Sequence, residues 1–241
     1  MKDYIDLHCH FVAGIDDGPQ TTDQGLQMLR ALRAAGFDTV IATPHMRPGL
    51  FDNLRQDLER AYSSMLREIA EARDLPRVEL SCEHYFDDTV FNRLLGGEAL
   101  PYPGGRAALL EFYDIDFPLS VQQRLADLLR RGMLPVIAHP ERYRCLWGSP
   151  EKLERLVDSG SVALLDTAAL VGKYGRETRR CAERLLELGL YHAACSDAHR
   201  PADVAEVQAG MRLVEERYGA EELDQLYRTG PRDILEGRAS P

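Results

Sequence analysis

Short apolar segments alternate with longer segments of helical periodicity along this chain, and this alternation constrains the fold more than any other feature of the sequence. Short apolar runs bounded by polar or turn residues are typical of buried strands. We expect seven of them, at residues 4–7, 39–42, 78–81, 107–110, 134–138, 162–165 and 192–196. Strands separated by helices form parallel sheets built from βα units. The sequence therefore predicts an α/β fold.

Helices are expected between these strands. Thr21 or Thr22 can cap the first one, and Gly36 directly follows its last turn. The apolar positions of this helix, Leu29 and Leu32 among them, fall on one face. Further helices are expected at residues 51–73, 121–131, 151–159 and 177–188. The inward residues of the longest one are expected to be Leu58, Tyr62, Met65, Leu66 and Ile69.

The chain has 241 residues, which one α/β barrel can use in full, and it contains no linker, repeat or low-complexity segment. We therefore expect residues 1–241 to form a single domain. The one long irregular segment, residues 84–105, is rich in Gly and Pro around a short helix expected near 89–95. A loop of this length in a compact domain is more often a lid or a specificity element than a passive surface excursion.

The formal net charge of −10 argues against nonspecific nucleic-acid binding, because an acidic surface releases no counterions from a phosphate backbone. No run of the sequence approaches the roughly 18 apolar residues that a membrane-spanning helix needs. The N-terminus, MKDYIDLHCHF, carries charges and lacks the apolar stretch of a signal peptide. We expect neither a nucleic-acid partner nor a membrane span.

The five cysteines are odd in number and scattered, and no two of them form a C-x-x-C pair. A disulfide framework is therefore not expected, and each cysteine is interpreted as a small buried apolar residue. This cysteine usage is typical of proteins in a reducing compartment, which indicates the cytoplasm.

Six of the seven expected strands lead into a histidine or an acidic residue, and another acidic residue lies in the loop after the first strand. Active sites of parallel barrels gather at the C-terminal ends of the strands, so these side chains are expected to lie together. The candidate metal ligands are His8, His10, Asp17, His45, Glu83, Glu111, His139, Asp197 and His199.

The spacing within two of these strand ends also suits metal binding. Residues i and i+2 of an extended chain point to the same side, so His8 and His10 can bind one ion together. The same geometry applies to Asp197 and His199. Either pair alone is more often structural than metal-binding. Their combination with the other candidates at matching strand ends favours a metal site.

The nine candidates offer only nitrogen and oxygen ligands, which suit manganese, iron, zinc or cobalt better than a cysteine-rich structural zinc site. Nine ligands are too many for one ion and generous for two. Three divalent ions would bring six positive charges against the four carboxylates of the set. The surplus suits a hydroxide and an incoming phosphate, so phosphate ester hydrolysis is the expected chemistry.

Other kinds of catalytic site lack their sequence patterns here. No cysteine is followed six residues later by an arginine, so the C-x5-R loop of thiol phosphatases is absent. The nucleotide loop G-x-x-x-x-G-K-[ST] and the nucleophile elbow G-x-S-x-G are absent too. The Asp16-Asp17-Gly18 run lacks the downstream ligands of a calcium loop.

Several short motifs together resemble the PHP (polymerase and histidinol phosphatase) superfamily. They are IDLHCH at 5–10, DDGP at 16–19, TPH at 43–45, the lone Glu83 and Glu111, AHPERY at 138–143, LVGKYG at 170–175 and SDAH at 196–199. The match is closer to one branch, the bacterial capsule-associated protein-tyrosine phosphatases of the CpsB/YwqE type. DDGP, HPERY and LVGKYG are the specific cues for this branch.

This resemblance implies a distorted TIM-like (β/α)7 barrel of the PHP type with a site for three divalent metals, of which manganese is the first expectation. Carried over residue by residue, the first metal would be held by His8, His10, Glu83 and Asp197. The second would be held by Glu83, Glu111 and His139. The third would be held by Asp17, His45 and His199.

The resemblance also implies the substrate, which is phosphotyrosine, typically on the tyrosine-rich tail of a bacterial tyrosine kinase that controls polysaccharide export. One alternative is a PHP phosphoesterase acting on a small molecule such as histidinol phosphate or a nucleotide, which a deep closed pocket would favour. Another is a noncatalytic metal-binding partner of a kinase. That reading predicts missing ligands, and none of the nine is missing.

Arg142 is the first candidate for contacting the phosphoryl group, because a guanidinium matches phosphate in bidentate geometry. An ion pair with Glu141 or Asp166 beneath the site is the alternative. Arg47, in the loop after the second strand, can face either the substrate or solvent.

Two features depart from the pattern of the CpsB/YwqE branch. That branch carries a second substrate-binding arginine several residues beyond the D-x-H, and Arg200 is the only close candidate in this chain. Relatives often carry amide and small polar residues near the sixth strand, where this chain has Asp166. An acidic group there can alter which phosphoester fits.

Overall fold

The computed structural model describes residues 2–239 and contains nine strand segments. They are β1 Tyr4–Cys9, β2 Phe37–Ala42, β3 His45–Met46, β4 Arg77–Leu80, β5 Glu83–Tyr85, β6 Ala107–Glu111, β7 Leu134–Ala138, β8 Val162–Asp166 and β9 Ala193–Cys195. Within the described residues, all pairs between these strands are parallel. The predicted α/β class is confirmed.

Two strand positions of the barrel are interrupted, which divides the strands into two sheets. One sheet has the order β1-β2-β4, and the other has the order β3-β5-β6-β7-β8-β9. β3 continues the path of β2 after Thr43 and Pro44, and β5 continues β4 after Ser81 and Cys82. Pro44 has no N–H to donate, so a continuous ladder is not available there. Seven strand positions remain, as predicted.

The first and last strands close the barrel through backbone hydrogen bonds. The N–H of Asp197 donates to the carbonyl of His8 at 2.9 Å, and the N–H of His10 donates to the carbonyl of Ala198 at 3.0 Å. The β1–β2 pairing has two register shifts, which distort the barrel. Closure therefore sets the H-x-H segment beside the D-x-H segment.

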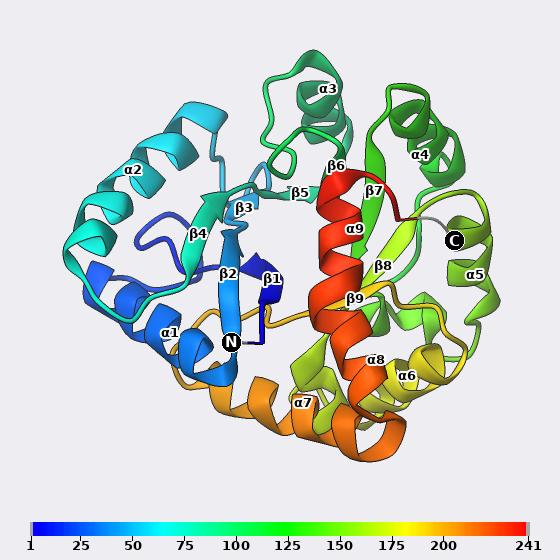
Figure 1. The fold of residues 1–241 in the computed structure, drawn as a ribbon. Helices are drawn as coiled ribbons and strands as arrows, with labels where there is room; N and C mark the ends of the chain where they lie inside the picture. The colour runs from blue at the N-terminus through cyan, green and yellow to red at the C-terminus, as the bar shows by residue number, and fades with distance from the viewer. Residues whose placement is uncertain (1, 240–241) are drawn as a thin grey trace.

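Helices surround the strands on the outside of the barrel (Figure 1). They are α1 Thr22–Ala35, α2 Arg55–Glu71, α3 Asp88–Gly96, α4 Val121–Arg130, α5 Glu151–Asp158, α6 Arg176–Glu187, α7 Asp203–Tyr218, α8 Ala220–Asp224 and α9 Gly230–Glu236. Thr21 caps α1 in a capping box with Gln24, and Gly36, with φ of 112°, ends it. A π-helical turn, Gln225–Thr229, joins α8 to α9. None of the helices in the described residues is long and apolar enough to cross a membrane.

The barrel interior is filled by alternate side chains of the strands, as the two-residue period of a strand requires. Fully buried members of this cluster include Leu7, Leu109, Val136 and Leu164. Ile234 of α9 packs into the same cluster, and Arg106, just before β6, donates to the carbonyl of Glu236 at 2.8 Å. The helix α9 therefore covers the N-terminal ends of the strands (Figure 1), which leaves the C-terminal ends for a site.

Three local expectations differ from the structure. The helix expected at 51–73 begins only at Arg55, because Phe51 N–H bonds to the carbonyl of Arg47 at 2.7 Å and holds a turn before it. Leu66, expected to be buried, is 39% exposed. The helices from α7 to α9 were not among the expected elements.

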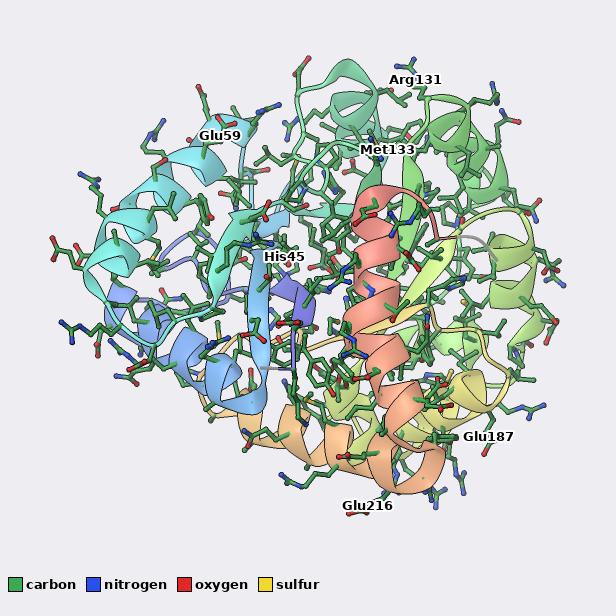
Figure 2. The ribbon with its side chains drawn as sticks, viewed as in Figure 1. His45, Glu59, Arg131, Met133, Glu187 and Glu216 are labelled. Atoms are coloured by element: carbon green, nitrogen blue, oxygen red, sulfur yellow. The ribbon has the colours of Figure 1, made fainter. Side chains whose placement is uncertain are left out.

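The irregular segment at 84–105 contains α3, which confirms the short helix expected near 89–95. Phe91 of α3 packs on Phe86 with ring centres 5.8 Å apart, and Arg124 of α4 lies over the same rings. Side chains fill the interior around His45, whereas Glu59, Glu187 and Glu216 project outward from the helices (Figure 2).

Candidate metal centre

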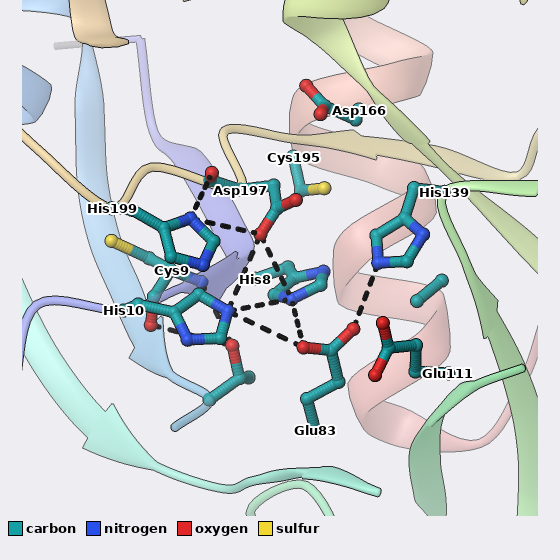
Figure 3. A network of polar contacts seen from close by, with 12 residues as sticks. His8, Cys9, His10, Glu83, Glu111, His139, Asp166, Cys195, Asp197 and His199 are labelled. Atoms are coloured by element: carbon teal, nitrogen blue, oxygen red, sulfur yellow. Dashed lines mark hydrogen bonds and ion pairs between the residues drawn. The ribbon is translucent and has the colours of Figure 1, made fainter. Parts of the chain in front are cut away.

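The structure brings all nine candidate ligands together at the C-terminal ends of the strands. Figure 3 shows the part of this cluster around His8, Glu83 and Asp197. β1 supplies one histidine within the strand and one just beyond it, β3 and β5 each begin with a ligand, and β6 ends with one. The remaining ligands follow β7 and β9, apart from Asp17 in the loop after β1. The grouping at strand ends that the sequence predicted is therefore present in space.

Glu83 lies at the centre of the cluster. Its Oε1 is 2.9 Å from Nε2 of His139, and its Oε2 is 3.0 Å from Nδ1 of His45. The same Oε2 lies 3.3 Å from Nε2 of His8. One carboxylate thus contacts imidazoles from three different strand ends, which is the arrangement of a bridging ligand.

Asp197 faces the histidine pair of β1. Its Oδ1 is 3.3 Å from Nε2 of His8 and 3.4 Å from Nε2 of His10. These two imidazole nitrogens are 3.1 Å apart. Their convergence confirms that the i and i+2 residues of this strand end point to the same side.

Asp17 forms the outer edge of the cluster. Its Oδ1 lies 3.4 Å from Nε2 of His45 and 3.3 Å from Nε2 of His199. The Asp17 side chain is 53% exposed, whereas Glu83 is almost fully buried. The cluster is therefore buried on the barrel side and open to solvent at Asp17.

Four groups within the described residues have ligand atoms within 4.8 Å of one another. They are His10, Asp17, His45 and His199; His8, His10 and Asp197; His8, Glu83 and His139; and His45, Glu83 and Glu111. These groups overlap with the three sets that the resemblance implied, although some histidines are shared between groups. The cluster is thus continuous, with no residue of the nine left outside it.

Two of the candidates have an unusual backbone. His139 has φ of 31° and Asp197 has φ of 42°, a left-handed region that non-glycine residues seldom adopt. Each follows the end of a strand, where the positive φ turns the chain. Strained backbone of this kind clusters at functional sites.

Burial and neighbouring charges set the pKa values in the cluster. Burial alone raises the pKa of the Glu83 carboxyl, but His8 and His45 hold it well below its usual range. Burial and the nearby Glu83 raise the pKa of Glu111 to about 7. Burial lowers the pKa of His139 to about 4, so its imidazole is neutral at pH 7. The neighbouring carboxylates act in the opposite direction on His45 and His199 and raise their pKa values, so metal binding would displace protons from these imidazoles.

The donor atoms of the cluster also fit a metal. Among the described residues, Nδ1 of His45, Oε2 of Glu111 and Oδ1 of Asp197 are buried and make no hydrogen bond of normal geometry, although each lies within 3.5 Å of a charged or titratable neighbour. Buried polar atoms are nearly always hydrogen-bonded, so such atoms call for another partner. Their nitrogen and oxygen chemistry matches manganese, iron, cobalt or zinc.

The three candidate arginines lie at different places on the rim. Arg142 donates to Oδ2 of Asp197 at 2.7 Å, so its ion pair is with this residue rather than with Glu141 or Asp166. Arg47 has Nη1 3.5 Å from Oε2 of Glu111. Arg200 is exposed and borders a hollow of about 330 Å³, whose lining is Asp17, Arg142, Lys173, Tyr174, His199, Arg200 and Asp203.

The family model for capsular polysaccharide synthesis, CpsB/CapC, matches residues 4–236. This chain belongs to the CpsB/CapC family. The matched region contains every candidate ligand and all three candidate arginines.

Relatives of this CpsB/CapC protein are similar over nearly their whole length. Tyrosine-protein phosphatase YwqE of Bacillus subtilis (strain 168) is 30% identical over 222 residues, which cover 90% of this chain and 86% of the relative. Tyrosine-protein phosphatase CpsB of Streptococcus pneumoniae is 27% identical over 238 residues, which cover 96% of this chain and 98% of the relative.

Solved structures agree with this family membership. A crystal structure described as YwqE from Bacillus subtilis and CpsB from Streptococcus pneumoniae, unique metal-dependent tyrosine phosphatases, matches with a TM-score of 0.90 at 28% identity. The match covers 98% of this chain and 96% of that chain. A lactonase from Listeria monocytogenes, with a TM-score of 0.59 and 10% identity over 97% of this chain and 94% of that one, shares the fold alone.

Asp16 is a site residue of this CpsB/CapC chain that the sequence reasoning missed. Its Oδ2 lies 2.8 Å from Nδ1 of His10 and accepts from the N–H of His45 at 3.1 Å, while Oδ1 accepts from the N–H of Gly18 at 3.0 Å. A carboxylate on the outer nitrogen of a ligating histidine fixes its tautomer and ring orientation. Its position in DDGP beside Asp17 was the available signal.

The strand that carries Glu83 is also supported by two residues that the sequence reasoning missed. Nε2 of His84 lies 3.1 Å from the thiol of Cys82, and Nδ1 lies 2.8 Å from the carbonyl of Leu109. Burial lowers the pKa of His84 to about 4, so this imidazole is neutral and can donate to one partner and accept from the other. Both contacts lie on the opposite side of the strand from Glu83.

Proposed function

We propose that this CpsB/CapC protein is a metal-dependent protein-tyrosine phosphatase. Its substrate would be phosphotyrosine on a bacterial tyrosine kinase of capsule or exopolysaccharide synthesis, which also places the protein in the cytoplasm. The observation that carries the proposal is Glu83, a buried carboxylate in contact with imidazoles from three strand ends. The relatives named tyrosine-protein phosphatases support the choice of substrate.

We assign three divalent cations, manganese in the first place, to the nine-residue cluster. The sets would be those that the resemblance implies: His8, His10, Glu83 and Asp197; Glu83, Glu111 and His139; and Asp17, His45 and His199. The four groups of neighbouring ligand atoms in the structure overlap with these sets. Bound cations would supply Lewis acidity toward phosphoryl oxygens and lower the pKa of a water molecule toward neutrality. The protein supplies the fixed ligand directions, which the buried barrel side of the cluster preorganises.

The residues of the rim would bind and orient the phosphoryl group. The Arg142 guanidinium carries N–H donors in one plane and can meet two phosphoryl oxygens. Arg200 and Arg47 would add charge from two other sides of the rim. In hydrolysis, water adds to phosphorus while the bond from phosphorus to the tyrosyl oxygen breaks. The leaving phenol has a pKa of about 10, so it needs less help from a general acid than an alkyl alcohol does.

The shape of the site favours a phosphate carried by a protein. Asp17, an outer ligand in this assignment, is 53% exposed, and the adjoining hollow of about 330 Å³ opens beside it. A phosphotyrosine side chain can reach such a site while its backbone stays outside. A small-molecule phosphoesterase acting on histidinol phosphate or a nucleotide is the second candidate, which a deep closed pocket over the cluster would favour.

The test is a comparison of substrates on protein that is stripped of metal and then loaded with manganese. We expect kcat/KM for a phosphotyrosine peptide to exceed that for histidinol phosphate and for the matching phosphoserine peptide. His139→Ala should abolish turnover of all three. A preference for histidinol phosphate would reject the tyrosine phosphatase assignment, and turnover without metal dependence would reject the metal centre.

A further inference from the structure

The segment at 170–175, a cue to the family in the sequence, has no role in the function proposed so far. Gly172 and Gly175 adopt left-handed φ values of 90° and 94°, which glycine accepts without a steric penalty. The N–H of Gly175 donates to the carbonyl of Gly172 at 3.0 Å. This tight turn presents Lys173 and Tyr174 to the hollow beside the metal centre.

Tyr174 is in contact with the first candidate for phosphate binding. The guanidinium carbon of Arg142 lies 4.7 Å from the centre of the Tyr174 ring. A guanidinium over an aromatic face is attracted by the ring quadrupole. A guanidinium that stacks on a ring through its face keeps the N–H donors in its plane available for another partner.

Arg142 has a competing partner in the same place. Its Nη1 donates to Oδ2 of Asp197 at 2.7 Å, and Asp197 is one of the assigned metal ligands. A long arginine side chain loses considerable rotamer freedom when it is held in one geometry. Packing on the Tyr174 ring restricts that freedom before a phosphate arrives.

Asp166, the acidic residue that departs from the branch pattern, lies near Tyr174 and outside the metal cluster. It is fully buried at the end of β8, and its Oδ1 accepts from the N–H of Ala168 at 2.9 Å. Its Oδ2 is buried without a hydrogen-bond partner among the described residues. The position of the Tyr174 ring is therefore set by the turn that carries it.

We propose that Tyr174 is a positioning residue for phosphate recognition, whose ring orients the guanidinium of Arg142 toward the phosphoryl group. This inference rests on the proposed function and adds a residue to the same site. It also explains the turn between Gly172 and Gly175, because this turn places the Tyr174 ring beside Arg142.

Replacing the ring tests the inference. In manganese-loaded protein, Tyr174→Leu should raise KM for the phosphotyrosine peptide about tenfold, and weaken binding of inorganic phosphate about tenfold in calorimetry, with a smaller change in kcat. Tyr174→Phe keeps the ring and should remain within about threefold of the wild type. Unchanged phosphate binding in Tyr174→Leu, or equal losses in both variants, would overturn the role of the ring.

A double-mutant cycle separates positioning from general packing. If Tyr174 acts through Arg142, then Tyr174→Leu should weaken phosphate binding no further in an Arg142→Ala background. Additive losses would overturn the proposal. Tyr218→Leu serves as the matched control, because Tyr218 ends α7, whose first turn lies beside the site. This variant should bind phosphate as the wild type does.

Calorimetry also keeps this inference distinct from the proposed function. If the wild type binds phosphate but hydrolyses no phosphotyrosine, the proposed substrate fails while the Tyr174 experiment still gives an answer. If the wild type hydrolyses phosphotyrosine and Tyr174→Leu is unaffected, only the positioning role fails.

Discussion

At the scale of single residues, the orientation of the candidate ligands depends on side chains that hydrogen-bond to them, and Asp16 is the main example. Oδ2 of Asp16 contacts both Nδ1 of His10 and the backbone N–H of His45. Burial alone raises the pKa of Asp16, but the adjacent His10 and His45 lower it below its usual range. Asp16 is therefore a carboxylate at neutral pH and can hold both ligands in register.

Replacing Asp16 by asparagine should weaken metal binding without unfolding the protein. The amide has a similar shape but lacks the charge that supports the outer nitrogen of His10. Loss of such a partner typically costs a metal site about 10–100-fold in affinity. Competition titration with a chelating dye measures this directly. Asp158→Asn, at an exposed position in α5, is the control and should leave the affinity unchanged; equal affinities in both variants would contradict the role of Asp16.

At the scale of elements, α9 packs on the N-terminal ends of the strands, and the candidate metal ligands gather at their C-terminal ends. Ile234 of α9 is fully buried among the starts of the strands. The candidate ligands lie at the opposite ends. Stability and activity should therefore respond to different substitutions.

Truncating Ile234 to alanine tests this separation. It removes buried methyl groups and leaves a cavity, which typically costs about 2–5 kcal/mol in the free energy of unfolding. Urea unfolding should show this loss, while KM for the phosphotyrosine peptide stays near that of the wild type at low temperature. Arg232→Ala, on the exposed side of α9, should change neither quantity. A large rise in KM for Ile234→Ala would mean that α9 and the site are coupled.

The barrel was predictable because each buried strand is a short apolar run, and six of the seven runs lead into a candidate metal ligand. The interruption between β2 and β3, and between β4 and β5, was not predictable. The pairing on either side of Pro44 depends on strands that are distant in sequence. The helices after His199 were missed although their signal was present: Val204, Val207 and Val214 of α7 are buried at helical spacing.

The site was predictable to a similar depth. All nine candidate ligands could be named from the sequence, because histidines and acids at the ends of buried strands have few structural explanations, and the structure groups them together. Asp16 and Asp17 are the same residue type in adjacent positions, so the sequence could not show that they have different contacts. The structure shows that Asp16 contacts Nδ1 of His10, whereas Asp17 contacts His45 and His199. The contact of Tyr174 with Arg142 joins segments that no sequence pattern relates.

At the scale of the whole molecule, metal binding should contribute to stability. The cluster holds buried carboxylates and imidazoles that compensate one another in the absence of cations. A ligand that binds only the folded state adds about 2.7 kcal/mol at 100 times its Kd. We expect manganese to raise the Tm of metal-free protein by about 5–10 °C, since about 1 kcal/mol corresponds to about 2–4 °C at this size.

Differential scanning calorimetry with and without manganese measures this shift. Glu83→Gln removes the charge at the centre of the cluster, so manganese should raise the Tm of this variant much less than that of the wild type. An equal shift in the variant would place the stabilising metal elsewhere on the molecule.

The most direct test of the central claim is a titration of metal-free protein with manganese, in which bound metal per chain and phosphotyrosine hydrolysis are measured on the same samples. We expect activity to rise steeply only as the second and third ions bind and to stop rising at three ions per chain. Full activity at one ion per chain, or activity that does not follow bound metal, would contradict a cluster of three metals as the catalytic centre.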